Sequence, residues 1–315
     1  MTHSRAVALM VLVTLMWSIA GVVTRHLDSA RSFEVTFWRS AFTSVALAVA
    51  LTAMRGAALW RDMARSTWPQ WVSGVCWAVM YTAFMIAVTL TNVANVLVTL
   101  AIAPLVTAVF ARVVLNHRLA RRTWLAIAVA GVGIAWMFVH EMQLESGALL
   151  GMGVALAVPI AGAVNGTLLQ HVSHGTGDPD DNSDGPDMLP AVLIGALISA
   201  TAMLPLSWPL RASGHDLSLL ALLGVVQLAI PCLLAVRLSR VLPGPEIALL
   251  ALLEVIFGVT WAWLGAGEAP SASALSGGAL VLAALIGNEA IALRVRMLQA
   301  RTPATTPQAD FRRGG

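Results

Sequence analysis

The stretch VANVLVTLAIAPLVTAVFARVVL, residues 93–115, decides the fold, because it is long, apolar and carries a single charged residue, Arg112. At 1.5 Å per residue, a helix of this length crosses the roughly 30 Å of hydrocarbon in a bilayer. Nine further stretches share this character. The sequence therefore predicts an all-α integral membrane protein with ten spans, at residues 6–24, 35–54, 70–90, 93–115, 123–139, 147–172, 188–208, 217–236, 245–265 and 273–295.

The composition argues against a water-soluble fold. Hydrophobic residues make up 58% of the chain and charged residues only 11%, which leaves too little polar surface to cover a soluble domain. The basic residues are all arginines, and they lie mostly in short loops rather than in a patch that could follow nucleic acid, so we expect no nucleic-acid partner. Cys76 and Cys232 fall inside apolar spans, where they are read as small core hydrophobes.

The distribution of arginines predicts the orientation. Arginines stay on the cytoplasmic side of a membrane because their translocation is unfavourable. With the N-terminus inside, the opposite side holds only Arg25, Arg31 and Arg211. The first span runs long and lacks a cleavage pattern, so we read it as retained rather than as a signal peptide. We expect both termini in the cytoplasm and the protein in a bacterial inner membrane.

Short motifs recur between the first and second sets of five spans. Ile19-Ala20-Gly21 returns as Ile160-Ala161-Gly162, and the positions of Pro104 and Arg118 return 150 residues later as Glu254 and Glu268. Five spans are an odd number, so the second copy must be inverted relative to the first. The predicted domains are residues 1–143, the first repeat; 144–299, the second repeat, with an acidic cytoplasmic linker at 174–187; and 300–315, a disordered tail.

Three motifs resemble the EamA family of the drug/metabolite transporter superfamily. They are Phe37-Trp38-Arg39 in the second span, the run from Ala103 to Val132, and the run from Leu253 to Pro270 with its closing Gly265-Ala-Gly-Glu268. Two departures are His117-Arg118 in place of Gly-Glu, and Val255 where a proline often follows Glu254. The resemblance implies ten helices in two inverted five-helix repeats around a central cavity, and export of amino acids, drugs or other small metabolites. The abundance of Trp suggests the aromatic amino acid exporter branch.

Charged residues inside the spans are the first candidates for function, since a charge at the bilayer centre costs about 2.5–3.5 kcal/mol even on the gentlest scale. Glu254 lies near the middle of the ninth span, where a carboxyl group facing a water-filled cavity can exchange a proton. The alternative is a protonated glutamate tied to a neighbouring helix. Arg39 is a second candidate for coupling, although near a span end it could instead snorkel or pair with Glu34.

Several polar or aromatic side chains at mid-membrane depth are candidates for binding substrate. Amide groups and flat rings of this kind suit a pocket for a zwitterion or an aromatic ring. Each also has a structural reading, as packing or as hydrogen bonds between helices. The candidates are Trp17, Tyr81, Thr99, Asn165 and Gln227, together with Glu254.

Prolines interrupt three of the spans. Pro104, Pro159 and Pro231 each remove a backbone donor and permit a kink, either as part of a moving gate or as a static bend. We count them as gating candidates.

No enzyme motif is complete. His140-Glu141 lacks the second histidine of a zinc protease, because residue 144 is Leu, and the calcium-like loop from Asp180 has Ala191 where a bidentate glutamate belongs. We therefore expect no metal, no cofactor and no enzymatic activity.

The first functional hypothesis is a secondary transporter that exports small organic solutes, most plausibly amino acids, by alternating access between two inverted repeats. We expect it to be a monomer in the lipid bilayer, with protons as a candidate coupling ion. The alternatives are an efflux carrier of another specificity, and a non-transporting membrane enzyme or sensor on the same helices.

Overall fold

A computed structural model describes residues 3–30, 32–114, 120–141, 148–174, 188–238, 241–242 and 244–301. Every regular element in these ranges is helical, as expected in lipid, where backbone polar groups must be bonded within the protein. The elements are α1 (His3–Ser18), α2 (Ala20–Thr24), α3 (Ser32–Arg55), α4 (Ala58–Ala64), α5 (Trp68–Leu90), α6 (Val93–Leu100), α7 (Ala103–Val114), α8 (Arg121–Glu141), α9 (Ala148–Ala155), α10 (Ala157–His174), α11 (Leu189–Ser207), α12 (Gly214–Leu222), η1 (Leu223–Ala229), α13 (Ile230–Leu238), α14 (Gly244–Ala266) and α15 (Ala272–Arg301).

In the described part of the chain, nine helical stretches are long and apolar enough to cross a membrane. This confirms the predicted all-α membrane protein. The remaining predicted span, the ninth at 245–265, corresponds to α14, of which the segment Leu250–Ala266 is apolar but shorter than the other nine. The count of ten and the division into two inverted repeats stay predictions. The predicted linker at 174–187 and tail at 300–315 lie almost wholly outside the described residues, as do His117 and Arg118.

Three of the spans are broken and a fourth is irregular. The first span divides at Ile19 between α1 and α2, the fourth at residues 101–102, and the sixth at Leu156. The eighth span is continuous, but its middle, η1, is a π-helix. Pro104, Pro159 and Pro231 each lie in the first turn of the segment that follows the break or the π-helix, where a missing backbone N–H costs least.

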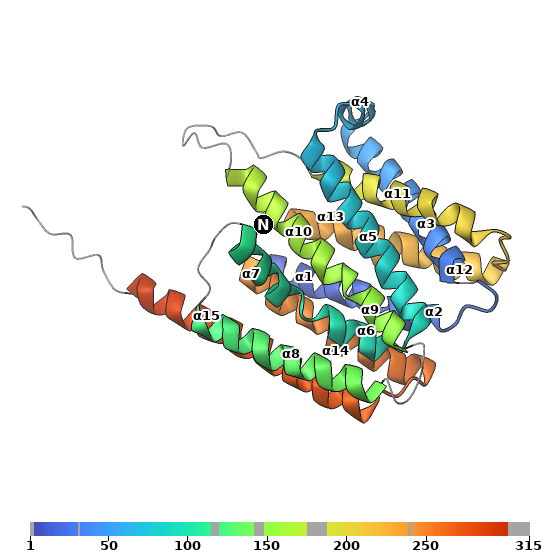
Figure 1. Ribbon diagram of the computed structural model, residues 1–315. Helices are drawn as coiled ribbons and strands as arrows, with labels where there is room; N and C mark the ends of the chain where they lie inside the picture. The colour runs from blue at the N-terminus through green and yellow to red at the C-terminus, as the bar shows by residue number, and fades with distance from the viewer. Residues whose placement is uncertain are drawn as a thin grey trace, which may run out of the picture.

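Caps define several helix starts at one end of the bundle. The side chain of Asn92 accepts a hydrogen bond from the Asn95 backbone N–H and begins α6. Ser213 and Asp216 form a reciprocal capping box that begins α12. We call this end, where α2 leads to α3, α5 to α6, α11 to α12 and α14 to α15, the distal end; α1 begins and α15 ends towards the opposite end (Figure 1).

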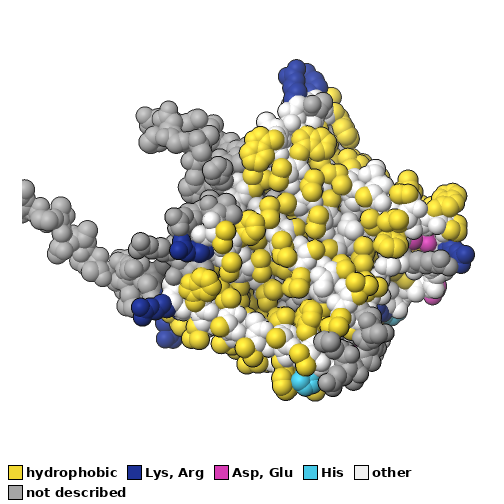
Figure 2. Space-filling view, viewed as in Figure 1, with side chains coloured by type: hydrophobic (Ala, Val, Ile, Leu, Met, Phe, Trp, Pro, Cys, Tyr) yellow, Lys and Arg dark blue, Asp and Glu magenta, His cyan; other side chains and the backbone are white. Residues whose placement is uncertain are grey.

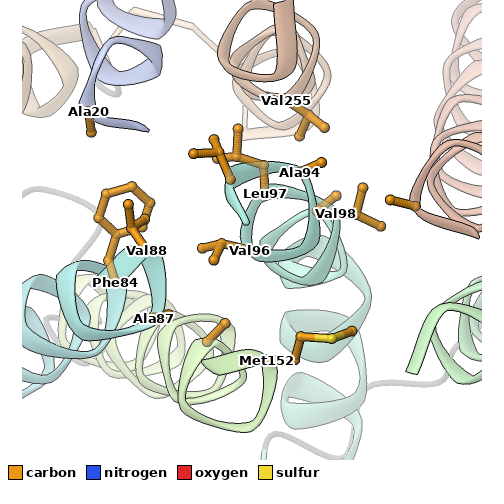
Figure 3. Close-up of a cluster of buried hydrophobic side chains, with 14 of the residues drawn as sticks. Ala20, Phe84, Ala87, Val88, Ala94, Val96, Leu97, Val98, Met152 and Val255 are labelled. Carbon is orange, nitrogen blue, oxygen red and sulfur yellow. The ribbon is translucent and has the colours of Figure 1, made fainter. Parts of the chain in front are cut away.

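The helices form a bundle in which α11 packs against α3 and α5, and α14 packs against α1 and α6. The pair α8 and α15 lies side by side along one flank (Figure 1). Figure 2 shows hydrophobic side chains over the middle of one face and charged side chains near its edges, the pattern of a surface that meets lipid. The largest buried apolar cluster joins α2, α5, α6 and α14 and includes Ala20, Phe84, Val88, Leu97 and Val255 (Figure 3).

Candidate functional site

Arg39 is a charged side chain buried inside this bundle, with 2% of its surface exposed. Its Nε and Nη2 both donate to Oε1 of Gln227, at 3.2 and 2.9 Å, and its Nη1 donates to the Tyr81 carbonyl at 3.4 Å. The guanidinium carbon lies 5.6 Å from the centre of the Phe84 ring, within range of a cation–π interaction. The sequence-based alternative, in which Arg39 snorkels to the membrane surface or pairs with Glu34, is therefore wrong.

Gln227 connects Arg39 to the first span. Its Oε1 accepts from Arg39, and its Nε2 donates to the Trp17 carbonyl at 3.1 Å. This carbonyl lies next to the break between α1 and α2. The amide thus joins three spans, α1, α3 and η1, through one side chain.

The π-helix that carries Gln227 packs closely on α3. A Cβ at Gly224 would lie 2.8 Å from the Arg39 carbonyl oxygen and 2.9 Å from the Thr43 backbone nitrogen. Thr43 Oγ1 donates to the Gly224 carbonyl at 3.0 Å and to the Arg39 carbonyl at 2.8 Å. Glycine at 224 therefore permits the approach that brings Gln227 to Arg39. Single π-helical turns within α-helices occur often at functional sites.

Tyr81 adds an aromatic wall to this polar centre. It is buried, its hydroxyl lies 3.8 Å from Cys232 Sγ, and its ring centre is 5.5 Å from that of Trp77. Trp17 and Trp77 are half-buried and pack against the same apolar cluster as Tyr81. Cys232 was read from the sequence only as core packing, but its position beside Tyr81 makes it part of the site.

Glu254 lies on α14 and faces this polar centre. Its carboxyl group is near enough to the Arg39 guanidinium for an electrostatic interaction, which places it on the inner side of α14. The side chain is only half-buried, and among the described residues no hydrogen bond to it is found. An acidic group in an apolar span without a protein partner is available to a ligand or to water.

The structure places two predicted residues away from this centre. Thr99 is fully buried and donates to the Asn95 carbonyl of its own helix at 2.7 Å. Asn165 accepts a hydrogen bond from Ser73 Oγ at 2.6 Å and so links α10 to α5. Of the prolines, Pro231 borders the site next to Cys232, whereas Pro104 and Pro159 lie in the first turns of α7 and α10, outside the Arg39 network.

Hydroxyl groups beside Arg39 were missed by the sequence analysis. Ser199 Oγ lies 2.9 Å from Ser40 Oγ and 2.8 Å from Thr82 Oγ1, which joins α3, α5 and α11. Serine and threonine are common in membrane helices, so composition gave no signal for this cluster. In the described residues, no group of three or more His, Cys, Asp or Glu side chains could hold a metal ion.

Buried carboxylates at the distal end were also missed. Glu34 and Asp216 accept hydrogen bonds from loop backbone N–H groups and are 1% and 0% exposed. The sequence did carry one signal, because Ser213-x-x-Asp216 is a capping-box pattern.

These features define a polytopic helical membrane protein with a buried polar centre between its helices. Residues 4–139 match the model of the EamA-like transporter family. The resemblance noted in the sequence to the EamA branch of the drug/metabolite transporter superfamily is confirmed over these residues.

The other comparisons concern the fold. A solved crystal structure, described only as that of a protein, is similar with a TM-score of 0.63 and 18% sequence identity, and the match covers 95% of this chain and 100% of the other. At that identity the likeness shows the fold alone. No curated protein matches the sequence.

Proposed function

We propose that the protein is a secondary transporter that exports small organic solutes, amino acids foremost, across a bacterial inner membrane, with both termini in the cytoplasm. The observation that carries this proposal is the pair of opposite charges at Arg39 and Glu254, on spans far apart in the sequence, inside a bundle with an apolar surface. A soluble enzyme would place such groups at a cleft open to water. In a membrane bundle they mark the route of a polar solute.

The arrangement suits a zwitterion. Glu254, which has no protein partner among the described residues, is available to an ammonium group. Arg39 and Gln227 supply positive potential and amide hydrogen bonds for a carboxylate. The half-buried rings of Trp17 and Trp77 beside Tyr81 offer an apolar surface for a side chain, which favours an aromatic amino acid over a sugar.

Exchange in proteoliposomes tests the proposal. Vesicles loaded with unlabelled phenylalanine should accumulate labelled phenylalanine by counterflow, and unlabelled tryptophan should compete. Vesicles loaded with glucose provide the control for leakage. If no amino acid exchanges or competes in sealed vesicles, the carrier function is wrong, and a sensor or an enzyme on this fold becomes the better explanation.

A second measurement addresses Glu254. The change Glu254→Gln removes a titratable group and keeps its size, so we expect the pH dependence of transport to change more than the apparent affinity for the solute. Asn165→Asp, on a span outside the polar centre, is a control for altered charge within the bundle. An unchanged pH profile in Glu254→Gln contradicts proton coupling through this residue.

A further inference from the structure

Three carboxylates at the distal end join the part of the chain before residue 142 to the part after residue 147. Glu34 Oε1 accepts hydrogen bonds from the backbone N–H groups of Arg211 and Ala212, at 2.7 Å each. Asp216 accepts from the backbone N–H groups of Asp28, Ser29 and Ala30, at 2.8 to 3.1 Å, and from the Ser29 hydroxyl. The third carboxylate, Glu268, differs from both in its partners.

Glu268 holds an arginine side chain as well as a backbone N–H group. Its Oε2 lies 2.6 Å from Arg25 Nε, and its Oε1 accepts a hydrogen bond from the Val93 backbone N–H, the first residue of α6. Arg25 Nη2 in turn donates to the Thr91 carbonyl at 2.7 Å. One ion pair thus ties together the end of α2, the turn before α6 and the loop after α14.

The environment of this ion pair is wetter than that of the other two carboxylates. The Arg25 and Glu268 side chains are 28% and 19% exposed, whereas Glu34 and Asp216 are almost fully buried. Two partly hydrated charges can separate with a small loss of free energy. If the buried carboxylates left their N–H partners, they would stay buried with no hydrogen bonds to replace those lost, which costs more. Glu34 and Asp216 therefore fix one side of the distal end, and the Arg25–Glu268 side is free to open.

An apolar seal lies directly below the ion pair. Side chains of α6 fit against glycines on the two neighbouring spans: a Cβ at Gly21 would lie 2.5 Å from Val93 Cγ1, and one at Gly258 would overlap Leu97. Ala20, Phe84, Leu97 and Val255 meet in this layer (Figure 3). Gly258 lies four residues after Glu254 on α14, towards the distal end, so its contact with Leu97 is on the distal side of Glu254.

We propose that Arg25 and Glu268 form a latch that holds the distal end closed, and that Val93 and Leu97, seated against Gly21 and Gly258, form the gate beneath it. The conformation described here is closed at the distal end. Release of the latch lets α2 and α14 move away from α6 and exposes the polar centre to that side of the membrane. The proposal rests on the proposed carrier function, and it adds gating residues outside the polar centre.

Accessibility of a cysteine in the gate tests the latch without knowledge of the solute. A membrane-impermeant maleimide is applied to right-side-out and to inverted vesicles that carry Leu97→Cys, since Leu97 is 3% exposed. We expect almost no labelling from the distal side in the otherwise unchanged protein. Adding Arg25→Gln or Glu268→Gln should raise the labelling rate from that side at least tenfold.

The matched control is Arg211→Gln, which removes an exposed arginine at the same end, because Glu34 binds the backbone of Arg211 and not its side chain. It should leave labelling unchanged. Elution as a single folded species in size-exclusion chromatography excludes misfolding of the variants. Rapid distal labelling before any latch change, unchanged labelling in both latch variants, or an equal rise in Arg211→Gln overturns the latch.

The outcome is separable from that of the proposed function. A cross-link between Arg25→Cys and Glu268→Cys should stop counterflow, and reduction should restore it, if both proposals hold. If labelling responds to the latch but no solute exchanges in any vesicle, the carrier function fails and the gate stands. If solutes exchange at the same rate with the cross-link in place, the latch fails and the carrier function stands.

Discussion

Adding one methyl group at Gly224 tests how the polar centre is assembled. The Cβ of Gly224→Ala would lie 2.6 Å from Phe42 Cβ, 2.8 Å from the Arg39 carbonyl oxygen and 2.9 Å from the Thr43 backbone nitrogen. Unstrained carbon contacts are about 3.5–4.0 Å, so η1 and α3 must separate by roughly 1 Å. None of the three atoms can move by rotation of a side chain. Overpacking of this kind costs about 1–3 kcal/mol.

The control for Gly224→Ala is Gly131→Ala on α8, where an added Cβ meets no atom within 4 Å. Both changes gain the same intrinsic helix propensity, about 1 kcal/mol, so the difference between them isolates the clash. That difference should lower the melting temperature of the purified protein by on the order of 2–12 °C. It should also weaken solute exchange, because the separation lengthens the hydrogen bonds from Arg39 to Gln227. Equal melting temperatures of the two variants would refute the close approach of η1 to α3.

Two further predictions concern stability. Asp216→Asn should destabilise the protein by at least about 2 kcal/mol, because an amide offers only one acceptor oxygen to the N–H and hydroxyl donors that the carboxylate binds. Thermal denaturation measures this loss, and the control is Asp28→Asn, because Asp28 bonds to Asp216 through its backbone N–H. An equal loss of stability in both variants contradicts the prediction. Gly277→Val should part α8 from α15, since a Cβ there would lie 2.6 Å from the Gly133 carbonyl oxygen. The melting temperature should therefore fall, while Gly287→Val, where an added Cβ on the same helix meets no atom within 4 Å, should leave it unchanged.

The spans could be predicted because lipid imposes one requirement on all of them, a long apolar run whose backbone is internally bonded. The interruptions near Pro104 and Pro159 followed from proline chemistry. The π-helix at Leu223–Ala229 did not, because LGVVQLA has the composition of any apolar helix and its geometry depends on packing against α3.

The sequence predicted most residues of the candidate site, but not which of them contact one another. Trp17, Tyr81, Gln227, Glu254 and Arg39 were selected as polar, aromatic or charged residues at membrane depth, and the structure brings them to one region. That Arg39 binds Gln227, 188 residues further on, and not the nearby Glu34 depends on which faces of α3 and η1 meet. No periodicity within one helix encodes such a pairing. Thr99 and Asn165 are also polar residues at membrane depth, but their side chains bond to other neighbours.

The glycine contact between α8 and α15 has a mechanical consequence. Gly133 and Gly277 bring the two backbones together, and an apolar groove lies on each side of the pair, one beside α7 and the other between α14 and α6. The grooves are lined almost wholly by aliphatic and aromatic side chains, which are compatible with the acyl chains of a bilayer. The pair α8 and α15 thus forms a closely packed unit that is separated by apolar grooves from parts of the rest of the bundle. We expect bilayer thickness and acyl-chain order to affect the packing of α8 and α15 against the bundle. Detergents that remove lipid should loosen this flank before they disturb the polar centre.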